Sequence, residues 1–144
     1  MTHKEAKQIA ALLNDRNQLA RTYTAADVLA EKEHYVYELR EGEVVACVEH
    51  KQVQWYQLEV HHLSVASAWE RKGLGSMVYQ RTEEFGRSKG ACLVQCTIRE
   101  GNVESEGFFV KHGFAKVGRF LYAPTGNTVG VWQKVLIAPR RVTA

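Results

Sequence analysis

A short glycine-rich turn lies between an apolar segment and a helical pattern, and its residue types suit phosphate binding. The segment is 63–75, L-S-V-A-S-A-W-E-R-K-G-L-G. A backbone that touches a phosphate cannot carry bulky side chains at the point of contact, which favours glycine there. The unpaired N–H groups and the dipole of a helix N-terminus favour an anion. The turn therefore predicts a phosphate or pyrophosphate site, with these contacts: Arg71, Lys72, Gly73, Leu74, Gly75 and Ser76.

Two side chains that can accept a proton precede this turn. Glu59 and His61 alternate along an apolar run, Val53–Val65, so both project from the face that carries Leu63. Burial would raise the pKa of a carboxyl group towards neutrality, and histidine titrates near neutrality already. Either residue could therefore take a proton from a substrate, directly or through water. His62 is expected to face the other side of the strand and to be structural.

Three other interpretations of these residues have less support than a phosphate-binding turn preceded by proton acceptors. A dinucleotide-binding fingerprint would need a third glycine where Val78 stands, and the preceding strands fit such a unit badly. A Walker motif would need Gly-Lys-Ser/Thr, which the turn lacks. A metal site at Glu59, His61 and His62 is unfavourable because adjacent strand residues point to opposite faces and no further ligand is evident. We therefore expect no metal.

Composition indicates a single globular domain. The chain has 144 residues, of which 45% are hydrophobic and 24% charged. A net charge of +3 is too small to indicate nucleic-acid binding, and no apolar run is long enough to span a membrane. The N-terminus lacks the apolar core of a signal peptide. The odd set Cys47, Cys92 and Cys96 contains no C-x-x-C pair, so we expect buried thiols and a cytoplasmic location.

The hydrophobic period changes from helical to alternating and back along the chain. Thr24 with Asp27 resembles a capping box, Glu41-Gly42 is a turn, and His50-Lys51 is a weaker turn. Asn102 can cap a helix that Gly113 ends. The expected order is helix 4–20, helix 25–33, strands 34–40, 44–49 and 53–65, helix 74–89, strand 91–98, helix 102–109, and strands 114–122 and 129–137.

This order, α-α-β-β-β-α-β-α-β-β, predicts an α/β (α+β) fold. We expect a mixed, mostly antiparallel sheet with helices on both faces. One domain should cover residues 1–139, followed by a loose tail at 140–144.

Two spaced motifs resemble those of the GNAT superfamily of N-acetyltransferases. The first is a strand ending L-x-V followed by [R/Q]-x-x-G-x-[G/A], which corresponds here to 63–65 and 70–75. The second is N-x-x-A-x-x-[L/F]-Y-x-x-x-G-F, represented by Asn102, Ser105, Phe108, Phe109, Gly113 and Phe114. The order of elements also fits the family from about residue 4 to residue 137.

The resemblance implies direct transfer of an acetyl group from acetyl-CoA to a primary amine. Backbone N–H groups of Leu63, Ser64 and Val65 would hold the thioester carbonyl and the pantetheine arm. Asn102 would bond to the CoA arm, and Phe109 would line its channel. Glu59 or His61 would serve as the base, because some relatives place histidines or a glutamate there. Tyr122, which ends a predicted strand, is the candidate acid.

Two positions depart from the family pattern. Glu70 stands where relatives usually have Arg or Gln, and a carboxylate beside a pyrophosphate is unfavourable, so we expect Glu70 to point away. Phe109 stands where many relatives have a tyrosine that protonates the departing thiolate. Phenylalanine has no proton to donate, and we therefore do not assign this role to position 109. These departures leave open a noncatalytic acyl-CoA-binding module. An acetyltransferase acting on a protein lysine or N-terminus is also open, and a homodimer is plausible only by resemblance.

Overall fold

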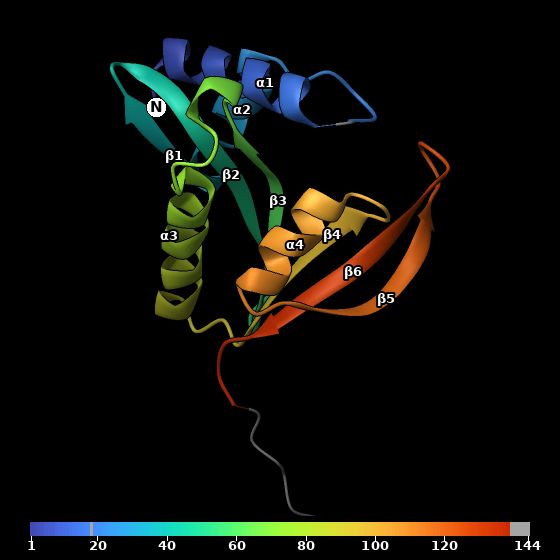
Figure 1. Cartoon of the computed structure of the whole chain (residues 1–144). Coiled ribbons are helices and arrows are strands. Elements are labelled where there is room, and N and C mark those ends of the chain that lie inside the picture. Colours follow the sequence, from blue (N-terminus) through green and yellow to red (C-terminus); the bar gives the residue numbers. More distant parts are fainter. Residues whose placement is uncertain (18, 139–144) are drawn as a thin grey trace, which may run out of the picture. The chain divides into compact units, whose positions relative to one another are not determined.

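The computed structural model describes residues 1–17 and 19–138 (Figure 1). The predicted tail and residue 139 lie outside the described residues. The predicted order of elements is confirmed, with two added 3-10 turns at Lys32–His34 and Ser67–Trp69. The elements are α1 (His3–Arg16), α2 (Ala25–Ala30), β1 (Tyr35–Arg40), β2 (Glu43–Gln54), β3 (Gln57–Val65), α3 (Leu74–Ser88), β4 (Leu93–Arg99), α4 (Val103–Lys111), β5 (Ala115–Tyr122) and β6 (Asn127–Val135).

The strands form one mixed sheet in the order β1-β2-β3-β4-β6-β5. The pairs β1–β2, β4–β6 and β5–β6 are antiparallel. The pair β3–β4 is parallel, and its register joins Gln57–Glu59 to Leu93–Gln95. The predicted mixed, mostly antiparallel sheet is therefore confirmed.

The chain divides into two compact units. Unit 1 comprises residues 1–51 and 60–84, and unit 2 comprises residues 52–59 and 85–144. Unit 1 contains α1, α2, β1 and most of β2, β3 and α3. Unit 2 contains β4, α4, β5 and β6.

Helices cover both faces of the strands in unit 1 (Figure 1). Neighbouring residues of a strand point to opposite faces. In β1 the Tyr37 hydroxyl donates to Glu5 of α1 at 2.7 Å, whereas Glu38 pairs with Arg81 of α3 at 3.5 Å. Thus α1 and α3 lie on opposite faces of this strand, as the sequence predicted.

Apolar residues of α1, α2, β1 and β2 form a buried cluster in unit 1. In α1 they recur at helical spacing, which gives the helix one apolar face. The cluster contains Ala6, Ile9, Ala10, Leu12, Leu13, Val28, Tyr35, Val44 and Cys47. Burial of these side chains fixes α1 and α2 against the sheet.

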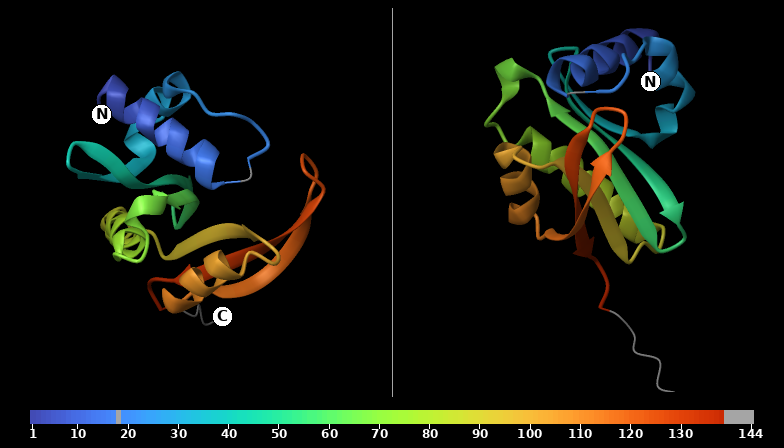
Figure 2. Two further views of the ribbon diagram at one scale, coloured as in Figure 1. Left: turned by 45° about the horizontal axis from the view of Figure 1, so that its top comes forward. Right: turned by 90° about the vertical axis from the view of Figure 1, so that its right-hand side faces the viewer.

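In unit 2, α4 lies beside β4 and β6 (Figure 2). Phe109 of α4 is buried, and its ring centroid lies 5.0 Å from that of Phe114. An added Cβ at Gly113 would lie 3.4 Å from Lys134 of β6, so the helix end contacts that strand. The edge strand β5 is exposed along its whole length.

The predicted turn at His50-Lys51 was wrong. The chain does not turn there, because β2 continues through both residues to Gln54. The turn instead falls at Trp55 and Tyr56. His50 is only 4% exposed, and burial within the long strand overrides its weak turn preference.

The predicted caps are confirmed. Thr24 and Asp27 form a capping box, and the Asn102 side chain accepts from the Ser105 N–H at 3.3 Å. Helix α1 ends at Arg16, with Asn17 as its C-cap. Within residues 1–17 and 19–138, no helix combines the length and the apolar character that crossing a membrane would require.

Candidate functional site

The predicted phosphate loop leads from a 3-10 turn into the first turn of α3, all within unit 1. Two residues of the loop have left-handed backbone, Arg71 at φ 62° and Gly73 at φ 75°. The Met77 N–H donates to the Gly73 carbonyl at 3.0 Å, so Gly73 caps the helix. A Cβ added at Gly73 would meet no atom within 4 Å. Glycine is therefore favoured there by the backbone conformation, not by crowding.

The carboxylate of Glu70, at the start of this loop, forms an ion pair with α1. Arg16, in the last turn of α1, donates to Glu70 Oε1. The side chains of Arg71 and Lys72 are exposed, and the Lys72 ammonium lies 6.0 Å from the Trp69 ring centroid. The ion pair with Arg16 of α1 supports the expectation that Glu70 points away from the phosphate site.

Replacing Glu70 with glutamine is expected to strengthen acetyl-CoA binding severalfold. The substitution removes a negative charge near the predicted phosphate site and releases the Arg16 guanidinium. Stability should change by less than about 1 kcal/mol, because the pair is partly exposed and screened. Calorimetric titration at two salt concentrations measures the effect, with Glu84→Gln, an exposed acid of α3, as the matched control. Weaker binding in Glu70→Gln than in the control would contradict this assignment.

Within strand β3, His62 has a left-handed backbone with φ 54°. A residue other than glycine adopts this conformation at a cost of about 1–2 kcal/mol, so surrounding contacts must hold it. The rings of His61 and His62 have centroids 5.8 Å apart. Their side chains therefore lie on the same side, and the expectation that His62 faces away from His61 was wrong. The regular alternation on which that expectation depended is interrupted here.

Ser64, the residue expected to hold the thioester through its backbone, is 2% exposed. Its hydroxyl donates to the His62 carbonyl at 2.9 Å and accepts from the Asn17 side chain at 2.7 Å. Asn17 is the C-cap of α1. The end of β3 is therefore tied to the end of α1, and the Ser64 side chain has an internal role. Its neighbours Leu63 and Val65 are partly buried.

The segment between α1 and α2 brings Tyr23 to this strand. The Tyr23 hydroxyl lies 3.3 Å from His62 Nε2, and the two ring centroids are 5.5 Å apart. The side chain of Asn14 in α1 makes two hydrogen bonds to the Tyr23 backbone. It accepts from the Tyr23 N–H and donates to the Tyr23 carbonyl, each at 2.9 Å. No local sequence pattern indicates a role for Tyr23, since its partner lies 39 residues away.

Burial lowers the pKa of His62 from 6.5 to about 4, against the opposing effect of the Glu49 charge. The imidazole is therefore neutral at neutral pH. Glu49 is itself buried, 4% exposed, and pairs with Lys51 at 3.5 Å. The electrostatics here keep a neutral nitrogen base beside the Tyr23 hydroxyl.

This lowered pKa predicts a pH dependence of stability. Between pH 6.5 and about 4, the unfolded chain protonates the His62 imidazole more readily than the folded chain does. The free energy of unfolding should therefore fall as the pH drops through this window, by up to about 3 kcal/mol from this group. The measurement is urea unfolding from pH 7 to 4 for the wild type and His62→Asn, because asparagine tolerates the left-handed backbone. Parallel pH profiles for the two proteins would contradict the prediction.

The other predicted site residues lie in unit 2. Glu59 is opposite Gln95 in the β3–β4 register, and Gln133 donates to Gln95 at 2.8 Å. Burial, followed by the charge of Glu59, raises the pKa of the Cys96 thiol to about 12, so that thiol is neutral.

Two of the remaining three candidates have observed structural roles. Asn102 caps α4. Phe109 packs between Phe108 and Phe114, with ring centroids 5.1 and 5.0 Å from its own. Tyr122 ends β5 and is 40% exposed. Since His61 belongs to unit 1, the predicted catalytic and binding residues are distributed over both units.

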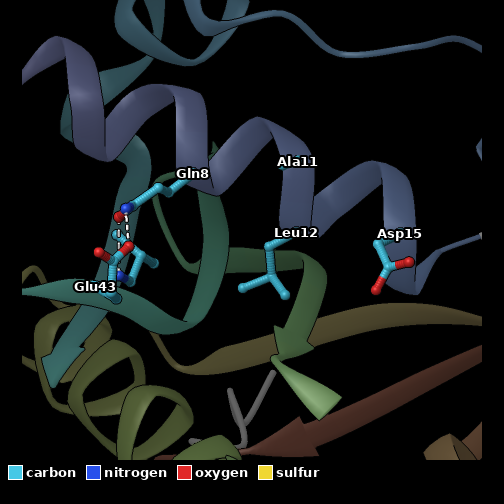
Figure 3. Close-up of a pocket in the computed structure, with 6 residues that line it drawn as sticks. Gln8, Ala11, Leu12, Asp15 and Glu43 are labelled. Carbon is cyan, nitrogen blue, oxygen red and sulfur yellow. Dashed lines mark hydrogen bonds between the residues drawn. The ribbon is translucent and has the colours of Figure 1, made fainter. Parts of the chain in front are cut away.

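An open surface pocket of about 330 Å³ in unit 1 contains none of the predicted site residues (Figure 3). It is lined by residues of α1 and the start of β2: Gln8, Ala11, Leu12, Asp15, Glu43 and Val44. The Gln8 side chain joins α1 to the start of β2 at this pocket. It donates to Glu43 and accepts from the Val44 N–H at 3.0 Å. Among residues 1–17 and 19–138, no group of three or more His, Cys, Asp or Glu is placed to hold a metal.

The sequence profile described as the Acetyltransferase (GNAT) family matches residues 5–114. This match covers most of the chain, which therefore belongs to the GNAT acetyltransferase family and is an acyltransferase. The predicted family is thus confirmed. No curated protein is significantly similar to the chain in sequence.

Solved structures share the fold over nearly the whole chain. Ard1 from Thermoplasma volcanium is 18% identical, with a TM-score of 0.83 over 96% of this chain and 95% of that one. The ribosomal-protein-alanine N-acetyltransferase from Brucella melitensis is 18% identical, with a TM-score of 0.81 over 94% and 97%. The yncA protein from Salmonella typhimurium, solved with its cofactor acetyl-CoA, is 17% identical, with a TM-score of 0.83 over 100% and 95%. At these identities the similarity shows the fold alone.

Proposed function

We propose that this protein transfers an acetyl group from acetyl-CoA to a primary amine. The observation that carries the proposal is the loop before α3, where Gly73 has a left-handed backbone and Glu70 is paired with Arg16. Because Arg16 balances the charge of this carboxylate, the helix N-terminus stays suited to a pyrophosphate. The yncA relative, which shares the fold, was solved with acetyl-CoA.

The proposed cofactor contacts divide between backbone and side chains. In unit 1 the backbone of Leu63, Ser64 and Val65 would hold the thioester and pantetheine. The pyrophosphate would bind to Gly73, Leu74, Gly75 and Ser76, with Arg71 and Lys72 nearby. In unit 2, Asn102 would bond to the CoA arm and Phe109 would line its channel.

The proposed reaction is direct. The amine nitrogen attacks the thioester carbonyl, the C–N bond forms, the C–S bond breaks, and the amine loses one proton. Glu59 or His61 of β3 is the proposed base, and Tyr122 is the proposed acid. A CoA thiolate is also a tolerable leaving group, so proton donation from solvent would suffice without a tyrosine at position 109.

The acceptor has two candidate classes. A small-molecule amine is the first. A protein N-terminus or lysine is the second, and it is favoured by the fold shared with a ribosomal-protein-alanine N-acetyltransferase. We propose a cytoplasmic location, which the free thiols of Cys47, Cys92 and Cys96 support. A homodimer is proposed from the family resemblance.

Calorimetric titration with acetyl-CoA, beside CoA, NAD and ATP, tests the proposed donor. We expect selective binding of acetyl-CoA and CoA. Thiol release with a panel of amines then tests transfer to an amine and identifies the acceptor. Binding of NAD or ATP in place of CoA would overturn the proposal.

A further inference from the structure

We propose that the hydroxyl of Tyr23, oriented by His62, binds the acceptor amine. This inference rests on the proposed acetyl transfer and deepens it by naming a residue that contacts the acceptor. All of its residues belong to unit 1. In this assignment Tyr23 contacts the substrate, and His62 is a positioning residue that acts through Tyr23.

Three aromatic rings follow one another beside the end of β3. The ring centroids of Tyr23 and His62 are 5.5 Å apart, and those of His62 and His61 are 5.8 Å apart. His62 immediately precedes Leu63–Val65, where we place the thioester. The row therefore leads from the α1–α2 segment to the strand that would present the acetyl group, and it includes one of the two proposed bases.

The backbone at His62 explains how this row forms. In a regular strand His61 and His62 would point to opposite faces. The left-handed conformation of His62, φ 54°, brings both rings to one side. Strain of this kind persists only where surrounding contacts hold it, and it concentrates at functional sites. Here the Ser64 hydroxyl donates to the His62 carbonyl at 2.9 Å and helps to hold the conformation.

Tyr23 is also fixed before any substrate arrives. Its backbone N–H and carbonyl are both bound by Asn14. The Arg21 guanidinium lies 4.4 Å from the centroid of the Tyr23 ring, and the capping box of Thr24 and Asp27 follows directly. A group held in this way loses little conformational freedom when it binds a ligand.

The hydrogen-bond chemistry then selects the ligand. A tyrosine hydroxyl has one proton to donate and lone pairs that accept. Burial keeps the pKa of His62 low, so its imidazole is neutral and can accept that proton in a hydrogen bond at Nε2. The Arg21 guanidinium also hydrogen-bonds to the Tyr23 side chain, and the second lone pair of the Tyr23 oxygen can accept an N–H from the amine. An amine bound through its N–H keeps its nitrogen lone pair available for attack on the thioester.

Kinetics of Tyr23→Phe test this assignment. The panel amines are phenethylamine, spermidine, a peptide with a free N-terminal alanine, and an N-terminally blocked peptide with one lysine. For the amine that the wild type acetylates best, we expect KM to rise about tenfold or more, with a smaller change in kcat. The dissociation constant of acetyl-CoA should stay unchanged. The matched control is Tyr37→Phe, which removes another hydroxyl hydrogen bond in unit 1, from Tyr37 to Glu5.

His62 variants supply a readout that a purely structural role would not give. His62→Asn keeps a side-chain acceptor and tolerates the left-handed backbone, whereas His62→Gly tolerates the backbone but offers no acceptor. We expect His62→Gly to raise the amine KM as Tyr23→Phe does, and His62→Asn to restore part of the loss. In nitrogen NMR of the wild type, Nε2 of His62 should carry no proton.

The outcomes separate this inference from the proposed function. If the wild type binds acetyl-CoA and turns over an amine, but Tyr23→Phe changes KM no more than Tyr37→Phe, the role of Tyr23 is wrong and the acetyltransferase stands. A protonated Nε2 would overturn the assignment independently of turnover. Failure of the wild type to bind acetyl-CoA would instead reject the proposed function. Binding of acetyl-CoA without turnover of any panel amine would overturn the acceptor role of Tyr23.

Discussion

Replacing Gly75 with glutamate is expected to weaken acetyl-CoA binding at least about a hundredfold. Gly75 is the second residue of α3, in the turn proposed to hold the pyrophosphate. The substitution adds bulk and a negative charge where the phosphate charges would lie. The helix should remain intact, because α3 has no acidic residue in its first turn and a carboxylate there is favourable to the dipole.

Calorimetry measures this effect, with thermal unfolding as a check on the fold. The matched control is Gly75→Gln, which adds similar bulk without charge. We expect glutamine to cost less affinity than glutamate, and the difference between the two should shrink at high salt. A folded Gly75→Glu protein that binds acetyl-CoA as the wild type does would show that the cofactor does not use this turn.

The second large effect is expected at β3. Glu59→Gln and His61→Ala should reduce kcat, and the residue that is the base should reduce it by about a hundredfold to ten-thousandfold. The dissociation constant of acetyl-CoA should change little, because neither side chain is proposed to contact the cofactor. Steady-state kinetics of both single variants and the double variant across pH identify the base.

His3→Ala, an exposed histidine in the first turn of α1, is the control for nonspecific effects. The pH profile should lose its acidic limb only in the variant that lacks the base. A double variant with normal rates at every pH would remove both residues as bases. The amine would then lose its proton to another group or to solvent.

The parts of the fold that were predicted correctly depend on short-range signals. The Thr24–Asp27 capping box and the Asn102 cap each involve residues three apart, so a local pattern is sufficient to find them. The alternation in Tyr35–Arg40 and the Gly73 turn are local as well. The turn at 50–51 failed because burial of His50 in a long strand outweighs its local preference.

The least predictable feature of the candidate site is the backbone of His62. A positive φ at a residue other than glycine has no sequence signature, because distant contacts stabilise it. Asn17 is 47 residues from Ser64, and Tyr23 is 39 residues from His62. The pairing of Glu70 likewise depends on Arg16, which is 54 residues away. A single sequence therefore predicts the loop and the strand but not the side chains that α1 and its following segment bring to them.

The most direct test of acetyl transfer is mass spectrometry of the amine panel after incubation with acetyl-CoA and the purified protein. We expect one acetylated amine, formed in equal amount to the free CoA thiol and only when the protein is present. We also expect Gly75→Glu to form much less of this product at the same acetyl-CoA concentration. Thiol release without any acetylated amine, or no reaction with any amine despite tight acetyl-CoA binding, would contradict acetyl transfer to an amine.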